Sequence, residues 1–162
     1  MPKIVPCLWF DQNAEEAAEF YVSVFPNSRI RNVVRYPENS PFPGQFPPGT
    51  AMTVDFELDG QPMTALNGGP IFTFSEATSL QIFCSDQEEI DHYWDGLTAD
   101  GGEESQCGWL KDRFGFSWQV VPTMLNEIQS DDDAKQQAVA EAILSMKKLV
   151  IADLQAAYDG AG

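Results

Sequence analysis

Three cysteines, Cys7, Cys84 and Cys107, are the residues best suited to nucleophilic chemistry in this chain. A catalytic thiol needs a cation or a histidine base beside it to lower its pKa. No histidine lies near Cys7 or Cys107 in the sequence, and Lys111 and Arg113 are the only cations close to Cys107. Two interpretations therefore stay open. Cys7 and Cys107 are either reactive thiols or small buried hydrophobic side chains.

Other side chains are suited to holding a small molecule. Asn67, Gln81 and Gln119 lie in or next to segments that read as buried strands, where an amide needs a partner. These amides either pair with one another or face a ligand. Trp9 and Trp109 offer flat surfaces that belong either to the core or to a pocket. The candidate pocket residues are Cys7, Trp9, Asn67, Gln81, Cys107, Trp109 and Gln119.

Metal ligation has few donors to draw on, because His92 is the only histidine. It lies in a predicted helix among Glu88, Glu89, Asp91 and Asp95. Acidic neighbours one helical turn away are typical of a solvated helix face. We therefore expect a surface histidine.

The first half of the chain predicts one helix among four strands. Lys3–Phe10 is a short apolar run, typical of a buried strand, and a turn follows it. Asn13 then predicts a helix N-cap with Glu16 as its capping-box partner. The helix presents one apolar face, made of Ala17, Phe20, Tyr21 and Val24.

Three further strands are predicted at Ser28–Tyr36, Thr50–Leu58 and Pro62–Asn67. The loop Pro37–Gly49 between the first two holds five prolines and two glycines, and is either a lid or an exposed loop. Three arginines of one parity lie on the first of these strands. They either attract an anion or form an exposed face that pairs with acidic residues, and they are Arg29, Arg31 and Arg35.

The same pattern then repeats. A strand at Ser79–Phe83 precedes a helix whose cap is Asp86 and whose capping partner is Glu89. The apolar residues Ile90, Tyr93, Trp94 and Leu97 each follow their first-half counterparts by 73 positions, as Phe83 follows Phe10. Short strands at Glu103–Cys107, Trp109–Asp112 and Ser117–Val121 complete the second copy.

Two copies of strand–helix–three strands predict an α+β fold, because neither copy can bury its sheet face alone. We expect two βαβββ modules, 1–72 and 73–122, that form one domain (1–122) with a curved, eight-stranded, concave sheet. The strand faces stay open. The repeat places Leu8 and Phe10 with Gln81 and Phe83, whereas hydrophobicity places Leu8 and Phe10 under the helix and Cys7 in the concavity.

The remaining residues, 123–162, predict a C-terminal helical extension. Asp131 is the expected cap of a first helix, and a second helix is expected from about Ala152 to Tyr158. An apolar stripe on the first helix predicts packing on the parent domain or a partner subunit. It consists of Val139, Ala142, Ile143 and Met146.

Charge and composition exclude several classes of function. The formal net charge of −16 repels phosphate backbones and anionic membrane surfaces, so we expect no nucleic-acid partner and no membrane partner. No run of about 18 apolar residues exists that could span a bilayer. Three widely spaced cysteines favour a reducing cytoplasm over a secreted disulfide framework.

Several motifs resemble the PhnB-like, 3-demethylubiquinone-9 3-methyltransferase-like branch of the vicinal oxygen chelate superfamily, which includes glyoxalases and bleomycin-resistance proteins. The resemblance extends over nearly the whole chain, helical tail included. It implies the paired βαβββ fold and a homodimer. The motifs are Pro6–Asp11, Ala14–Tyr21, Leu66–Pro70, Ser79–Phe83, Cys107–Gly115 and Ser117–Pro122.

The resemblance also indicates where a metal would bind. Metal-dependent relatives place His or Glu on the first and last strand of each module. In this chain the corresponding positions fall on Pro6 or Cys7, on Ser79 or Leu80, near Thr64 and on Gln119. None is His, Asp or Glu, so we expect no metal and no cofactor. A Gly-rich turn typical of S-adenosylmethionine enzymes is also missing after every predicted strand.

The function expected from the residues is metal-free binding of a small organic molecule in the concavity. The alternative is an enzyme of this superfamily. It would be a thiol enzyme, a metal-dependent lyase or oxygenase with ligands at other positions, or a methyltransferase as the family name suggests.

Overall fold

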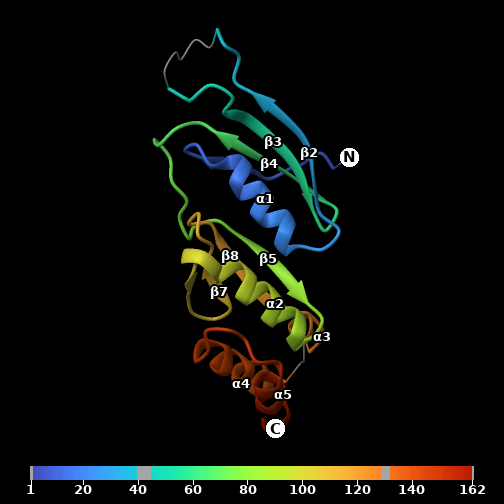
Figure 1. The fold of residues 1–162 in the computed structure, drawn as a ribbon. Helices are drawn as coiled ribbons and strands as arrows, with labels where there is room; N and C mark the ends of the chain where they lie inside the picture. Colours follow the sequence, from blue (N-terminus) through green and yellow to red (C-terminus); the bar gives the residue numbers. More distant parts are fainter. Residues whose placement is uncertain (1, 40–44, 129–131, 162) are drawn as a thin grey trace. The chain divides into compact units, whose positions relative to one another are not determined.

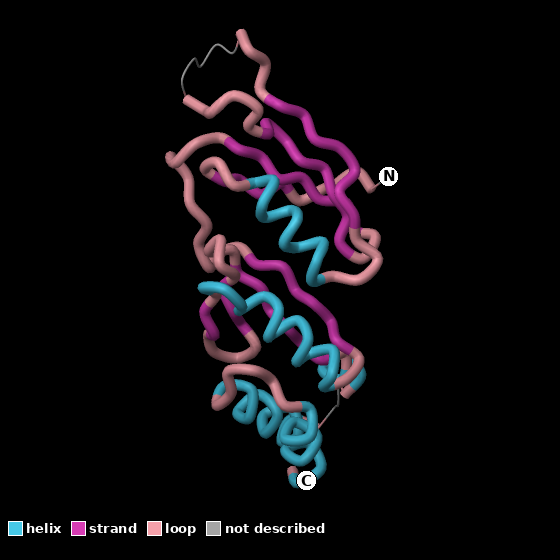
Figure 2. Tube along the Cα trace, in the orientation of Figure 1, coloured by secondary structure: helices cyan, strands magenta, loops and turns pink. Residues whose placement is uncertain are grey.

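The computed structural model describes residues 2–39, 45–128 and 132–161 of the chain. These residues form two compact units, Met1–Phe74 and Ser75–Gly162. Each unit contains one four-stranded sheet and the order strand, helix, three strands (Figures 1 and 2). The predicted βαβββ repeat is therefore confirmed, whereas the joining of both sheets into one concave surface stays a prediction.

In the first unit, helix α1 (Ala14–Val24) covers one face of the sheet β1-β4-β3-β2 (Figure 1). β1 runs parallel to β4, and the other neighbours are antiparallel. Alternate residues of β1, β3 and β4 point to the helix and form the core, as the period-2 pattern predicts, whereas the edge strand β2 has no buried residue. The strands are β1 (Cys7–Phe10), β2 (Arg29–Arg35), β3 (Ala51–Leu58) and β4 (Gln61–Asn67).

The second unit repeats this arrangement with helix α2 (Gln87–Thr98), which a short 3-10 turn, Ala99–Gly101, extends. Its sheet has the order β5-β8-β7-β6, with β5 parallel to β8. The predicted apolar face of α2 is buried against the sheet. The strands are β5 (Ser79–Cys84), β6 (Glu103–Glu104), β7 (Trp109–Lys111) and β8 (Ser117–Pro122).

The strand faces follow hydrophobicity and not the 73-position repeat. Leu8 and Phe10 are 6% and 3% exposed under α1, whereas Phe83, the expected counterpart of Phe10, is 47% exposed. The parallel pairs Cys7–Thr64 and Ser79–Ser117 occupy the same register positions in the two sheets. One residue more separates strand from helix in the second unit, so the offset is 73 in the helices but 72 in the strands, and strand parity inverts.

The two module helices begin in different ways. Asp86 caps α2 as predicted, because its carboxylate accepts a hydrogen bond from the Glu89 backbone N–H at 2.8 Å. Asn13 is the N-cap residue of α1, as predicted, but its side chain makes no capping hydrogen bond. The backbone N–H of Ala14 donates instead to Asn67 Oδ1 at 2.9 Å. Asn67, a strand residue distant in sequence, thus accepts the hydrogen bond from the start of α1.

Three helices follow β8: α3 (Met124–Glu127), α4 (Asp133–Leu144) and α5 (Ile151–Gly160). The expected cap Asp131 lies outside the described residues, and Asp132 caps α4. The predicted apolar stripe packs around buried Val139, Leu149 and Leu154, which confirms that it serves packing.

The segment between α4 and α5 fastens this extension to the second unit. The backbone N–H groups of Cys107 and Gly108 donate to the carbonyls of Met146 and Lys147, both at 2.8 Å. Gly108 has φ +84°, and a Cβ there would lie 2.9 Å from the Val120 carbonyl oxygen. Only glycine fits this close approach without strain.

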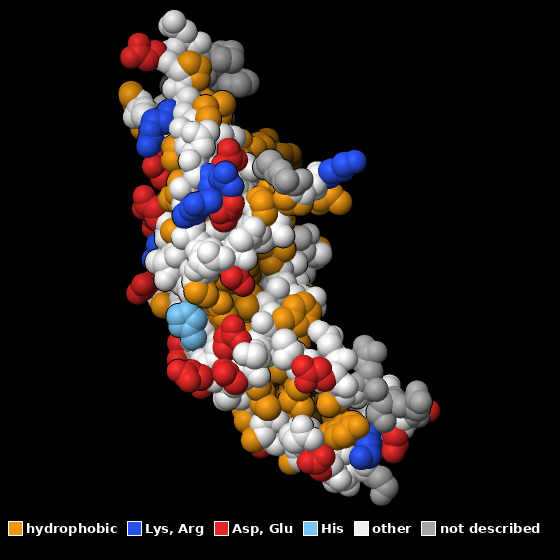
Figure 3. Space-filling view, turned by 90° about the vertical axis from the view of Figure 1, so that its right-hand side faces the viewer, with side chains coloured by type: hydrophobic (Ala, Val, Ile, Leu, Met, Phe, Trp, Pro, Cys, Tyr) orange, Lys and Arg blue, Asp and Glu red, His pale blue; other side chains and the backbone are white. Residues whose placement is uncertain are grey.

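None of the helices in the described residues has the length and apolar composition needed to cross a membrane. Acidic side chains are spread over the face drawn in Figure 3, consistent with the net charge of −16. His92 is exposed on α2, as its acidic neighbours predict.

Candidate functional site

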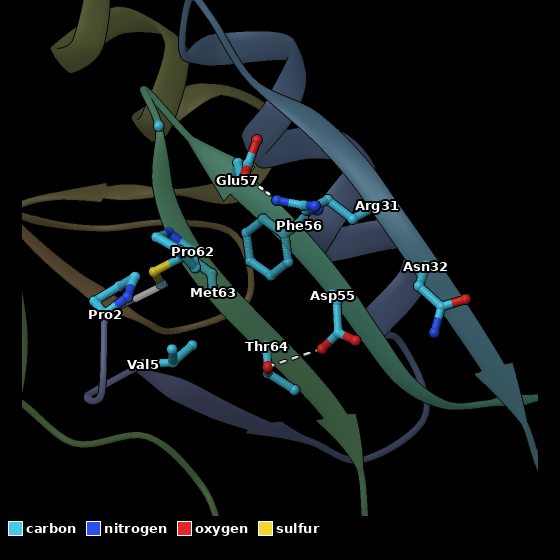
Figure 4. A pocket seen from close by; sticks show the side chains of 11 residues that line it. Pro2, Val5, Arg31, Asn32, Asp55, Phe56, Glu57, Pro62, Met63 and Thr64 are labelled. Carbon is cyan, nitrogen blue, oxygen red and sulfur yellow. Dashed lines mark hydrogen bonds and ion pairs between the residues drawn. The ribbon is translucent and has the colours of Figure 1, made fainter.

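Each sheet has an open face, the face opposite its helix. On the first sheet a polar row crosses all four strands of this face. The register pairs Cys7 with Thr64, Thr64 with Asp55, and Asp55 with Asn32. Directly paired residues lie on the same side of a sheet, so a thiol, a hydroxyl, a carboxylate and an amide stand side by side. Thr64 Oγ1 donates to Asp55 Oδ1 at 3.0 Å (Figure 4).

A cavity of about 700 Å³ lies over the Thr64, Asp55 and Asn32 part of this row. Polar groups from β2, β3 and β4 line one part of it, and apolar side chains line the rest (Figure 4). Such a size and mixture are typical of small-molecule sites. The lining residues are Pro2, Val5, Arg31, Asn32, Asp55, Phe56, Glu57, Gly60, Pro62, Met63 and Thr64.

Sequence reasoning found Cys7 at the end of the row but missed Asp55 and Asn32. The signal for Asp55 was available, because the alternation of Thr50–Leu58 that identified the apolar face also identifies its polar face. Asn32 had no such signal. A register shift between Ile30 and Asn32 turns it toward the open face, and such shifts leave no clear trace in the sequence.

The arginines of β2 do not share one face, which corrects the parity expectation. Arg29 Nε donates to Glu57 Oε2 at 3.0 Å, and Arg31 donates to the other oxygen of the same carboxylate. A second register shift, between Val34 and Arg35, follows. Arg35 then donates to Glu15 of α1, at 2.9 and 3.0 Å. The expected pairing with acidic residues is confirmed.

These ion pairs also lower the pKa of both carboxylates. The hydrogen bond from Arg31 is the largest cause that holds the pKa of Glu57 below its ordinary value. The hydrogen bond from Arg35 does the same for the pKa of Glu15. The carboxylates and guanidiniums of these pairs therefore stay charged and mutually engaged near neutral pH.

Trp9 lies on the open face of β1 but is committed to local structure. Its indole Nε1 donates to the Gly69 carbonyl at 3.0 Å, and its ring packs edge-on to Phe72 at 5.0 Å. A Cβ at Gly68 would lie 2.1 Å from the ring. The Gly68–Gly69 pair therefore admits the indole, and its backbone groups do not form a cradle for a nucleotide.

Asn67, another predicted pocket residue, is only 1% exposed and belongs to the core. Its Oδ1 accepts from the Ala14 backbone N–H, and its Nδ2 donates to the Ala51 carbonyl, both at 2.9 Å. Both ends of the amide are engaged within the protein. Asn67 therefore pairs within the protein and does not face a ligand.

The second sheet brings together Gln81, Gln119 and Trp109. The register places Gln119 between the other two on the open face. Gln81 Nε2 donates to Gln119 Oε1 at 3.4 Å, and Gln119 Nε2 donates to Ser79 Oγ at 2.8 Å. The amides thus pair with one another while remaining partly exposed.

Ser117, beside Ser79 in the same row, is 1% exposed, and its hydroxyl has no hydrogen-bond partner among the described residues. A buried hydroxyl of this kind commonly binds water or a ligand.

The turn between β7 and β8 is held by one buried carboxylate. Asp112 Oδ1 accepts from the backbone N–H groups of Phe114 and Phe116, at 2.9 and 3.1 Å. Its Oδ2 accepts from the Trp118 indole N–H at 2.8 Å. Asp112 is 2% exposed, so these three bonds replace its hydration and fix the two strands that carry Trp109 and Gln119.

The three cysteines are free thiols. Burial is the main cause that raises the pKa of Cys84 to about 12, and the negative charges of Glu89 and Asp86 add to it. Burial also raises the pKa of the Cys7 thiol, and Asp55 raises it further. A nucleophilic thiol needs the opposite shift. Cys107 lies at φ +62° in the turn before β7 and is partly exposed.

We expect the Asp55→Asn variant to alkylate about two- to fivefold faster at Cys7 than wild type at pH 8. Removing the negative charge lowers the Cys7 pKa and increases its thiolate fraction. Iodoacetamide labelling followed by peptide mass spectrometry measures the rate. Cys84 should stay unlabelled in both folded proteins, and an unchanged Cys7 rate would contradict the influence of Asp55.

The described residues contain no group of three or more His, Cys, Asp or Glu side chains that could hold a metal ion. At the strand positions where relatives bind metals, the structure places Cys7, Thr64, Ser79 and Gln119. Hydroxyl and amide groups are poor ligands for a divalent ion that prefers carboxylate and imidazole, and the single thiol of Cys7 does not supply the three or four donors that such an ion needs. This donor set does not fit the metal centre of the superfamily.

Comparison with known proteins places this geometry in context. A model of the 3-demethylubiquinone-9 3-methyltransferase family matches residues 2–121. The sequence-based expectation that the resemblance includes the helical tail is therefore wrong. A comparison with curated proteins gave no match.

Several solved structures are similar to this chain. A Bacillus cereus PhnB protein, described as a candidate 3-demethylubiquinone-9 3-methyltransferase, is 34% identical with a TM-score of 0.67. The alignment covers 75% of this chain and 99% of that protein. Protein PA1353 from Pseudomonas aeruginosa is 20% identical (TM-score 0.62, coverage 75% and 98%). The fosfomycin resistance protein FosX from Listeria monocytogenes is 13% identical (TM-score 0.51, coverage 78% and 97%). The last two show likeness of fold alone.

Proposed function

The chain belongs to the 3-demethylubiquinone-9 3-methyltransferase family, a PhnB-like branch of the vicinal oxygen chelate superfamily. From that premise we propose that it binds a small organic molecule on the open face of its first sheet without a metal ion. The observation that carries the proposal is the cavity of about 700 Å³ that Thr64, Asp55 and Asn32 of the polar row line. Its volume suits a compound of moderate size.

Metal independence is supported by the donor set. Lewis-acid chemistry requires three or four donors that converge on one ion. The strand positions in question carry Thr64, Ser79 and Gln119, whose side chains are neutral, and Cys7, which supplies a single thiol. Recognition would therefore depend on hydrogen bonds and apolar contacts.

The family name suggests methyl transfer from S-adenosylmethionine, but the glycines that could approach such a cosubstrate are used elsewhere. Gly68 and Gly69 follow β4 and receive the Trp9 indole. The sheet has mixed strands in the order β1-β4-β3-β2, whereas a nucleotide-binding fold places a Gly-rich turn after a strand of a doubly wound parallel sheet. These residues therefore do not fit S-adenosylmethionine as a cosubstrate.

A ligand screen tests the proposal. Thermal-shift measurements at neutral pH with small aromatic and quinone-like compounds should yield compounds that raise the unfolding midpoint, because a ligand that binds only the folded state stabilises it. The shift should be the same with and without EDTA. Uniformly absent shifts would refute ligand binding, and a shift lost in EDTA would refute metal independence.

The Asn32→Trp variant locates the binding. Asn32 lies on the exposed edge strand β2 and lines the cavity, so an indole there fills the cavity at little cost to the fold. We expect this variant to lose the ligand-induced shift. Val34→Trp is the matched control, because Val34 lies on the same strand, is 39% exposed and does not line the cavity. Equal loss in both variants would place the ligand elsewhere.

We also propose a homodimer in the cytoplasm. The family resemblance supports the dimer, and the three free thiols support a reducing compartment. Ile71 and Phe72, 73% and 60% exposed, are the apolar residues that we expect to contact a second copy. Light scattering coupled to gel filtration measures the assembly state, and a monomer at micromolar concentration would contradict the dimer.

A further inference from the structure

We propose that the ligand of the first-unit cavity carries a cationic nitrogen, an amine or amidinium group, that pairs with the Asp55 carboxylate. The inference rests on the proposed function and adds the chemical class of the ligand. Its basis is the unequal use of the charged groups around the cavity.

The charges on β2 and β3 fall into two sets. Glu57 accepts hydrogen bonds from both Arg29 and Arg31, so each of its oxygens is paired with a guanidinium group. Figure 4 shows the pair with Arg31. Asp55, two residues earlier on the same face, makes no ion pair within the described part of the chain. Its hydrogen-bond donor there is the Thr64 hydroxyl, at 3.0 Å.

A carboxylate has about four acceptor sites on its two oxygens, and one hydroxyl uses one of them. Asp55 is partly buried, so water competes less for the remaining sites than it does at the rim. Arg29 and Arg31 have side chains that are 68% and 53% exposed, where solvent weakens any contact to a ligand. A charged group of a ligand therefore gains more binding free energy at Asp55 than at Arg29 or Arg31.

The other walls complete the definition of the ligand class. Pro2, Val5 and Pro62 give the cavity an apolar side, while Asn32 continues the polar row beyond Asp55 (Figure 4). The chain has a net charge of −16, which attracts cations and repels anions at long range. A compact apolar compound with one protonated nitrogen would contact the apolar side with its carbon atoms and the polar row with its charge.

The test compares benzylamine, protonated at neutral pH, with benzyl alcohol, its neutral counterpart of similar shape. Their dissociation constants are measured on the full chain by ¹⁵N–¹H NMR titration, in low and in high salt. We expect benzylamine to bind about tenfold more tightly in low salt and to perturb the amides of Asn32, Asp55 and Thr64. High salt should reduce this preference without affecting the alcohol.

The Asp55→Asn variant should bind benzylamine about as weakly as benzyl alcohol. Asp153→Asn is the matched control, because it removes the same charge from an exposed position on α5 and should leave the preference unchanged. If Asp55→Asn fails to fold, the position of the benzylamine-induced amide shifts in the wild-type protein decides the question, because attraction to the net charge of −16 is also salt-dependent but does not place the amine at Asn32, Asp55 and Thr64.

The possible negative results distinguish the cation inference from the proposed function. Equal binding of the two compounds at the cavity overturns the cation inference and leaves the proposed function standing. The same holds if Asp55→Asn retains the preference. Perturbation of no cavity residue by either compound overturns the cation inference, and flat thermal shifts across the screen would then overturn the proposed function as well.

Discussion

Replacing Asp112 with alanine is expected to lower the free energy of unfolding by about 3–5 kcal/mol. The carboxylate accepts from two backbone N–H groups and from the Trp118 indole, and it is 2% exposed. Its removal leaves these donors without partners, and those of Phe116 and Trp118 are buried. Urea-induced unfolding, followed by tryptophan fluorescence, measures the change.

Two controls separate the hydrogen bonds from the loss of charge. Asp112→Asn keeps one oxygen for Phe114 and Phe116 but opposes an NH₂ group to the indole, so we expect an intermediate loss of about 2 kcal/mol. Asp153→Ala removes an exposed carboxylate and should change stability by less than about 0.5 kcal/mol. A loss below about 1 kcal/mol for Asp112→Ala would show that the turn does not depend on this residue.

Replacing Asn67 with alanine is expected to cost about 2–4 kcal/mol, the second large effect. The variant loses the acceptor for the first N–H group of α1, on Ala14, and the donor for the Ala51 carbonyl. Both groups are buried, and truncation also leaves a small void. Hydrogen exchange of the α1 amides should accelerate in the same variant, because the helix loses its N-terminal partner.

Asn13→Ala is the informative comparison. The sequence favours Asn13 as the cap of α1, but its side chain makes no capping bond in the structure. We expect a loss of less than about 0.5 kcal/mol, against about 1 kcal/mol for a working N-cap. Equal losses of stability for Asn13→Ala and Asn67→Ala would contradict this expectation and show that Asn13 stabilises the start of α1 as much as Asn67 does.

The predictable part of this fold is the part that hydrophobic periodicity determines. Alternation along 50–58 and the spacing of Ile90, Tyr93, Trp94 and Leu97 report directly which side is buried, and the structure buries it. The start of α1 at Asn13 was predictable, but the hydrogen bond to its first N–H group was not, because Asn67 reaches the helix through strand pairing with β1 and not through the sequence around it. Local rules cannot identify a partner supplied by tertiary structure.

The candidate site shows the same division. Gln81, Gln119 and Trp109 were named from residue type while their strand faces stayed open, and the sheet brings them into one row. Asp55 follows from the alternation of β3, whereas Asn32 enters the first row through a register shift that residue types do not specify. The spacing of 73 between the helices misled the strand assignment, because one additional residue between strand and helix inverts every face.

The fastening of the turn at Cys107–Gly108 by Met146 and Lys147 has a consequence for biosynthesis. All strands and the helix of the first unit have emerged from the ribosome long before these two carbonyls are made, so that unit can fold while translation continues. The turn of the second unit acquires these backbone partners only after the segment between α4 and α5 has also emerged. Until then the turn before β7 lacks the two carbonyls, and chaperones would meet it in that state.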